Sequence, residues 1–76
     1  MNAHAAYLDP WTREMVDLRD AVTAAVFELR AELARLDRAN CPLSPADAET
    51  VRRGLHRAVD ELDELDARIS RRLARP

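Results

Sequence analysis

Apolar residues recur at helical spacing through the first half of the chain. From Trp11 onward they alternate in steps of three and four, which is the spacing of a helix that buries one stripe. One extra residue of slip falls near Glu32. The pattern predicts a helix over 9–38 whose contact stripe is called here the predicted seam. Its residues in this helix are Trp11, Met15, Leu18, Val22, Ala25, Leu29, Leu33 and Leu36.

The second half of the chain repeats nearly the same spacing. It predicts a second helix over 45–75, with Arg residues gathered in the last turns, where cations complement the helix dipole. The predicted seam continues in this helix through Val51, Leu55, Ala58, Leu62, Leu65, Ile69 and Leu73.

Helix-start signals precede both stripes. Asp9 can accept hydrogen bonds from free backbone amides, and Pro10 fits the first helical position because it loses no intrahelical hydrogen bond there. Ser44 and Pro45 repeat this arrangement before the second helix. The segment between the helices, 39–44, is therefore predicted to be a short loop.

So short a loop makes the two helices antiparallel neighbours. The sequence predicts an all-α fold, a coiled-coil-like helical hairpin of two long helices that occupies 9–75, preceded by a flexible N-terminal segment over 1–8. The charges fit this pairing, because basic and acidic residues would meet at both ends. The expected neighbours are Arg68, Arg71, Arg72 and Arg75 with Asp9, Glu14, Asp17 and Asp20, and Arg30, Arg35 and Arg38 with Asp47 and Glu49.

A second apolar stripe on the first helix points away from the predicted seam. It consists of Val16, Thr23, Phe27 and Ala34. A hairpin of this size without a disulfide or a metal usually needs a further surface to be stable, and exposed apolar patches mark contact surfaces. We therefore predict a protein interface on this stripe, used either for a homodimer that forms a four-helix bundle or for a larger protein partner. The alternative is that Phe27 is merely tolerated on the surface.

Composition supports helices and narrows the classes of partner. The chain has 76 residues, 47% hydrophobic and 34% charged, with a single Gly. Its net charge is −2, which argues against nucleic acid as a partner because phosphate binding needs a basic surplus. There is neither a secretory signal nor an apolar run long enough for a membrane span, so we expect a cytoplasmic protein.

The sequence contains no strong signal for catalysis, a cofactor or a metal. His4 and His56 lack the Glu-x-x-His spacing of di-iron bundles, and Cys41 with His56 supplies too few ligands for structural zinc. Cys41 lies in the loop, where no pocket is predicted, so we interpret it as a small turn residue. A role as an exposed thiol that crosslinks chains is the alternative. Gly54 stands alone inside the second helix and forms no phosphate-binding loop.

Two segments, LRDAVTAAV (18–26) and LHRAVDELD (55–63), resemble the opening helix of all-helical chorismate mutases. The resemblance implies a small dimeric enzyme with several Arg side chains converging inside the bundle. Here the predicted seam is entirely apolar and the Arg residues fall on outer faces, so we expect no enzyme.

The function predicted from sequence is a non-enzymatic protein–protein interaction module, such as a small regulator, an adaptor or a docking domain, that acts through helix-on-helix packing. The alternative is a helical-bundle regulator that binds nucleic acid through the basic end RISRRLARP. An acidic run, from Asp60 to Asp66, directly precedes that end and argues for a charge-balanced face instead.

Overall fold

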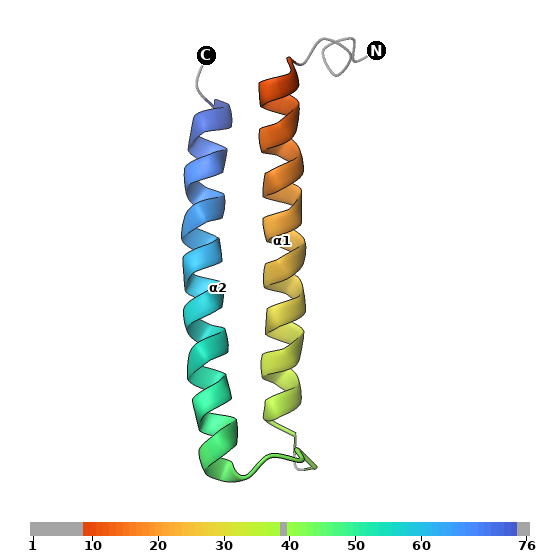
Figure 1. Ribbon diagram of the computed structural model, residues 1–76, viewed down its shortest axis with the longest axis vertical. Helices are drawn as coiled ribbons and strands as arrows, with labels where there is room; N and C mark the ends of the chain where they lie inside the picture. Colours follow the sequence, from red (N-terminus) through yellow and green to blue (C-terminus); the bar gives the residue numbers. More distant parts are fainter. Residues whose placement is uncertain (1–8, 39, 75–76) are drawn as a thin grey trace.

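The fold is a hairpin of two long helices. The computed structural model describes residues 9–38 and 40–74, in which α1 spans Pro10–Leu36 and α2 spans Pro45–Ala74. The helices run side by side in opposite directions and pack against each other, and the described residues contain no strand (Figure 1). The predicted all-α hairpin is confirmed. The predicted flexible segment 1–8 lies outside the described residues.

Side-chain caps fix where both helices begin. The Asp9 carboxylate accepts a hydrogen bond of 2.6 Å from the Thr12 backbone N–H and one of 3.1 Å from the Thr12 hydroxyl. At the start of α2, the Ser44 hydroxyl oxygen accepts a hydrogen bond of 3.1 Å from the backbone N–H of Asp47. Each cap satisfies a backbone amide that has no partner in the first turn of its helix.

The C-terminal end of α1 tightens before the loop. Asp37 N–H donates to the carbonyl oxygen of Ala34 at 3.2 Å, and Arg38 N–H donates to that of Arg35 at 3.3 Å. Both bonds span three residues, the pattern of a narrowing last turn. The helix therefore ends at Leu36, ahead of the expected Arg38.

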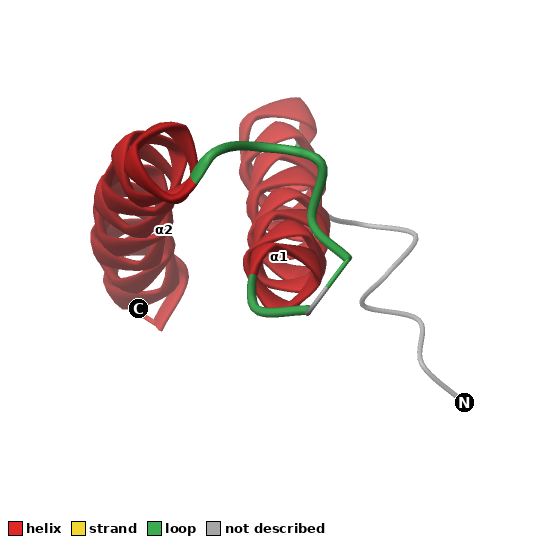
Figure 2. Cartoon of the chain, turned by 90° about the horizontal axis from the view of Figure 1, so that it is seen from below, coloured by secondary structure: helices red, strands yellow, loops and turns green. Residues whose placement is uncertain are grey.

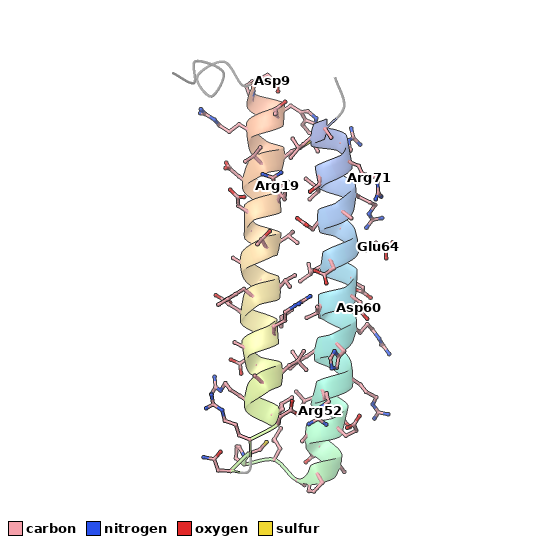
Figure 3. The ribbon with its side chains drawn as sticks, turned by 180° about the vertical axis from the view of Figure 1, so that it is seen from behind. Asp9, Arg19, Arg52, Asp60, Glu64 and Arg71 are labelled. Carbon is pink, nitrogen blue, oxygen red and sulfur yellow. The ribbon has the colours of Figure 1, made fainter. Side chains whose placement is uncertain are left out.

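Two ion pairs set the relative height of the helices. Arg30 Nη2 lies 3.0 Å from Asp63 Oδ2, and Arg52 Nη2 lies 2.9 Å from Asp37 Oδ1. Figure 3 agrees, since it shows Arg19 of α1 at a similar height to Arg71 of α2. These interhelical pairs differ from those expected from sequence: among the described residues, no ion pair joins the Arg-rich end of α2 to the acidic start of α1.

The interior of the hairpin is thin. Within residues 9–38 and 40–74, the buried apolar side chains are Met15, Ala48 and Val59, and none is fully enclosed. Seen from the loop end, the two helices form a single layer, and no other described helix lies across either face (Figure 2). The shortest dimension is 15 Å, little more than the diameter of about 10–12 Å of one helix with its side chains.

The contact face of α1 differs in register from the predicted seam. Leu18 and Trp11 are 51% and 65% exposed, whereas Arg19 and Val26 are half-buried. The inward residues then alternate in steps of four and three without a slip, as a regular two-helix packing requires. They are Met15, Arg19, Val22, Val26, Leu29, Leu33 and Leu36. The slip inferred near Glu32 arose because Leu18 and Ala25 belong to a neighbouring stripe.

The contact face of α2 shows the same strict alternation. Val51, predicted in the seam, is 40% exposed, and Arg52 beside it is half-buried. Asp66 likewise takes an inward position. The inward residues are Ala48, Arg52, Leu55, Val59, Leu62, Asp66, Ile69 and Leu73. The contact faces are therefore not purely apolar, and the sequence-based premise that every Arg lies on an outer face is wrong.

Candidate docking face

One long edge of the hairpin is closed by charged side chains in the half nearer the loop. Arg30 of α1 bonds to Asp63 of α2, and Asp37 bonds to Arg52 near the loop. A second carboxylate, that of Glu49, lies 2.7 Å from Arg52 Nη1. We call this side of the hairpin the polar edge. Because its cations and carboxylates satisfy one another across the two helices, it offers little apolar surface to a partner.

Arg52 is the most involved residue of the polar edge. Its side chain is 30% exposed, so its apolar stem packs between the helices while the guanidinium reaches two carboxylates. The hydrogen bond to Asp37 first, and that to Glu49 second, raise the pKa of Arg52 above its ordinary value. Figure 3 shows Arg52 near the loop, whereas Asp60, Glu64 and Arg71 lie on the side of α2 turned away from α1.

The opposite long edge is apolar and exposed. On α1 it carries a row at intervals of seven residues, which is a straight line along one face of a packed helix. Leu18 and Trp11 are its most exposed members, and Val51 is the most exposed member of a matching row on α2. We call the two rows together the apolar edge. It consists of Trp11, Leu18 and Ala25 of α1 with Val51, Ala58 and Leu65 of α2.

A pocket shows that both rows lie on the same side of the hairpin. Glu32 continues the α1 row, and it lines one pocket of about 340 Å³ together with Val51. The pocket opens at the loop end, so we call it the hinge pocket. Its apolar walls come from both helices and from the loop. The lining residues are Glu32, Arg35, Leu36, Arg38, Asn40, Cys41, Pro42, Leu43, Val51 and Leu55.

The hinge pocket corrects the sequence-based view of Cys41. The thiol is free and half-buried, and it stands in the wall of a pocket that was not predicted. No histidine, the usual base beside a catalytic thiol, is among the described residues that line the pocket. His56 is exposed on α2, and His4 lies outside the described residues.

The interface stripe predicted from sequence lies elsewhere on α1. Phe27 is 76% exposed, Thr23 and Ala34 are also exposed, and Val16 is half-buried beside the contact face. Leu18 and Phe27 are nine residues apart, which at about 100° per residue places them on opposite sides of the helix. The Phe27 stripe and the apolar edge are thus two separate surfaces.

The apolar edge escaped the sequence analysis because its members were assigned to the predicted seam. Each of these members lies one position before an inward residue: Leu18, Ala25, Val51, Ala58 and Leu65. A helical period therefore fits this stripe almost as well as it fits the true contact face. The sequence did contain a signal for the true contact face. A stripe with strict heptad spacing has no slip, whereas the predicted seam has one near Glu32. Following that rule would have moved Leu18 out of the contact face.

Three further features of the described part of the chain concern metal binding, a second hollow and membrane spanning. Residues 9–38 and 40–74 hold no group of three or more His, Cys, Asp or Glu side chains that could hold a metal ion. A shallow second hollow on α2 is lined by mixed charges, including Arg53, Arg57 and Glu61. Over the same ranges, neither helix has an apolar stretch sufficient to cross a bilayer.

Comparisons with protein-family models, with curated proteins and with solved structures give no match to this chain. The feature of the hairpin that indicates a function is the contrast between its polar and apolar edges.

Proposed function

We propose that the chain is a non-enzymatic protein–protein interaction module that docks helix on helix through its apolar edge. A small regulator, an adaptor or a docking domain would use such a surface. The observation that carries the proposal is the pair of apolar rows along the two helices, in which Trp11, Leu18 and Val51 are 65%, 51% and 40% exposed. The other members, Ala25, Ala58 and Leu65, are half-buried. Exposed apolar surface that is grouped on one side of a domain marks interaction sites.

The weakness of the hairpin interior supports a docking role. Three small or flexible side chains are buried among the described residues, and a layer of two helices encloses none of them fully. Most helical stability in proteins comes from packing an apolar face rather than from helix propensity. A second layer of helices on the apolar edge would complete the packing that the single layer leaves unfinished.

The pairing of Arg52 supports a non-enzymatic role. An active site of the chorismate mutase type would need Arg side chains free to bind a substrate inside the bundle. Arg52, the inward Arg nearest the loop, instead has its two terminal guanidinium nitrogens bonded, Nη2 to Asp37 and Nη1 to Glu49. Its charge is thus already used by the protein itself.

Site-specific photo-crosslinking in the native host tests the proposal. A benzophenone amino acid is placed at Leu18 on the apolar edge and, as the matched control, at Asp60 on the outer side of α2. We expect protein adducts from position 18 and few from position 60. A third variant carries the probe at Phe27. It tests the interface on the Phe27 stripe, which stays a prediction.

Two outcomes would contradict the docking role of the apolar edge. One is the absence of any adduct from position 18 in a folded, expressed protein. The other is a set of adducts from position 27 without any from position 18, which would transfer the role to the Phe27 stripe. Whether the adduct is a second copy or another protein does not affect this test.

A further inference from the structure

We propose that the apolar edge is covered by a second copy of this chain, packed so that the loop of each hairpin lies beside the open end of the other. The open end is the end that holds the start of α1 and the end of α2 (Figure 1). The inference rests on the proposed function, because it names what covers the apolar edge. The product is a four-helix bundle in which α1 packs antiparallel to the second α1, and α2 to the second α2.

A knob and a hole at opposite ends of the apolar edge favour this arrangement. Trp11 stands at the open end, 65% exposed, and the hinge pocket of about 340 Å³ lies at the loop end of the same edge. Leu36, Leu43 and Val51 give the pocket apolar walls, beside the polar Glu32, Arg35, Arg38 and Asn40. A two-fold axis across the middle of the hairpin places the Trp11 of each copy over the hinge pocket of the other, so the surface is complementary to itself.

The charges that flank the apolar edge agree with the same axis. Glu14, Glu28 and Arg35 each follow a position of the α1 row by three residues, on its outer side. When the two α1 helices run antiparallel with Trp11 over the hinge pocket, Glu14 of one copy faces Arg35 of the other, which also bonds to Glu32 of its own helix at 2.9 Å. On α2 the corresponding flanking residues are Glu61 and Arg68, which face each other across the same axis. Opposite charges at facing positions favour the register.

The alternative with both loops at one end is disfavoured by charge. It packs α1 of one copy on α2 of the other at equal heights, and the ion pairs Asp37–Arg52 and Arg30–Asp63 place Glu28 at the height of residues 61 to 65. Glu28 then lies near Glu61 of the second copy, and the contact occurs twice. Its two-fold axis runs along the hairpin, so the copies cannot slide to separate these like charges. In the proposed arrangement, the two copies can shift along each other without losing the two-fold symmetry. The facing charges can therefore set the register.

The size of the face is sufficient for a stable dimer. The apolar edge runs along one of the two broad faces of the hairpin, and this face measures 53 Å by 22 Å. A specific interface takes about 800 Å² from each partner, which this face can supply. Joining two such layers also gives the apolar edges a common interior, which one layer of 15 Å lacks.

Quenching of Trp11 fluorescence by a label on the other copy tests the arrangement. The chain has a single Trp, so its emission reports one site. Unlabelled wild-type chain is mixed with an excess of a Trp11→Phe chain that carries a nitroxide on Cys41 in the loop. The matched control chain carries Trp11→Phe, Cys41→Ser and a nitroxide on Ala74→Cys at the open end. Both labelled chains lack Trp11, and only the unlabelled wild-type chain fluoresces. Any quenching therefore comes from a label on the other copy.

We expect the label at position 41 to remove most of the Trp11 emission at micromolar concentration, and the label at position 74 to leave it nearly unchanged. Quenching by the label at 74 alone would overturn the arrangement in favour of loops at one end. Sedimentation as a monomer, without quenching by either label, would overturn the second copy as partner. In both cases the docking role still stands if position 18 forms protein adducts, so the two proposals fail separately.

Discussion

Arg52 of α2 and Asp37, which follows the last turn of α1, are joined by a hydrogen bond of 2.9 Å across the loop end of the hairpin. The Arg52 side chain is mostly covered, whereas that of Asp37 is 70% exposed. The pair therefore combines an apolar stem that packs between the helices with a charged group at the surface. Two substitutions can separate these contributions.

Arg52→Met keeps an unbranched stem and removes the charge, whereas Arg52→Ala removes both. Because exposed ion pairs contribute little and stem packing is retained in Met, we expect Arg52→Ala to lower the midpoint of urea unfolding more than Arg52→Met. Asp37→Asn serves as the control that alters the charge alone. An Arg52→Met protein as unstable as Arg52→Ala would show that the charge dominates.

The cap at Asp9 predicts a pH dependence at the start of α1. The backbone N–H of Thr12 and then its hydroxyl lower the pKa of Asp9 below its ordinary value of 3.8. Because the folded pKa is the lower one, the cap's contribution is fully present above pH 3.8 and is lost as the pH falls through the folded pKa. We expect the difference in thermal midpoint between wild type and Asp9→Asn to shrink as the pH falls below 3.8. A difference independent of pH would contradict the role of the carboxylate.

Gly54 lies inside α2, and a Cβ added there would meet no atom within 4 Å. Gly54→Ala should therefore stabilise the helix by about 1 kcal/mol through backbone entropy alone, measured by urea unfolding. Ala67→Gly, at an exposed site of the same helix, should destabilise by a similar amount. Loss of stability in Gly54→Ala would instead indicate that a partner approaches this position closely.

Arg19 occupies an inward position that the regular alternation would fill with an apolar residue. Arg19→Leu should raise stability by about 1 kcal/mol, since part of one Leu side chain is removed from water. Arg13→Leu, on the exposed side of α1, should have little effect on unfolding. Equal effects of the two substitutions would contradict the register of the contact face.

Leu62 of α2 and Phe27 of α1 should respond differently to truncation. Leu62 faces α1, so Leu62→Ala should cost at least about 2 kcal/mol from lost burial and the cavity that remains. Phe27 is 76% exposed, so Phe27→Ala should change stability by less than about 0.5 kcal/mol. Urea unfolding at several protein concentrations would measure both free-energy changes. A large, concentration-dependent loss in Phe27→Ala would support an interface on the Phe27 stripe.

The sequence by itself determined the elements and their connection. Asp9 with Pro10 and Ser44 with Pro45 mark the helix starts by local hydrogen bonding, which needs no distant partner. The loop between α1 and α2 is too short to carry the chain back to the start of α1, so the two helices must run antiparallel. These features depend on residues close together in the chain, so they can be deduced without knowing how the helices face each other.

Only the tertiary structure decided which stripe of each helix faces inward. Leu18 and Arg19 are neighbours in sequence, and about 100° of helix rotation moves one inward and the other to the surface. Hydrophobicity favoured Leu18, but packing selects a stripe that stays in contact over the whole length, and this one includes Arg19 and Arg52. Long Arg stems can lie in a contact face while their charges reach its margin. The apolar edge and the hinge pocket follow from that choice, because both are made by residues of two helices that meet only in the folded chain.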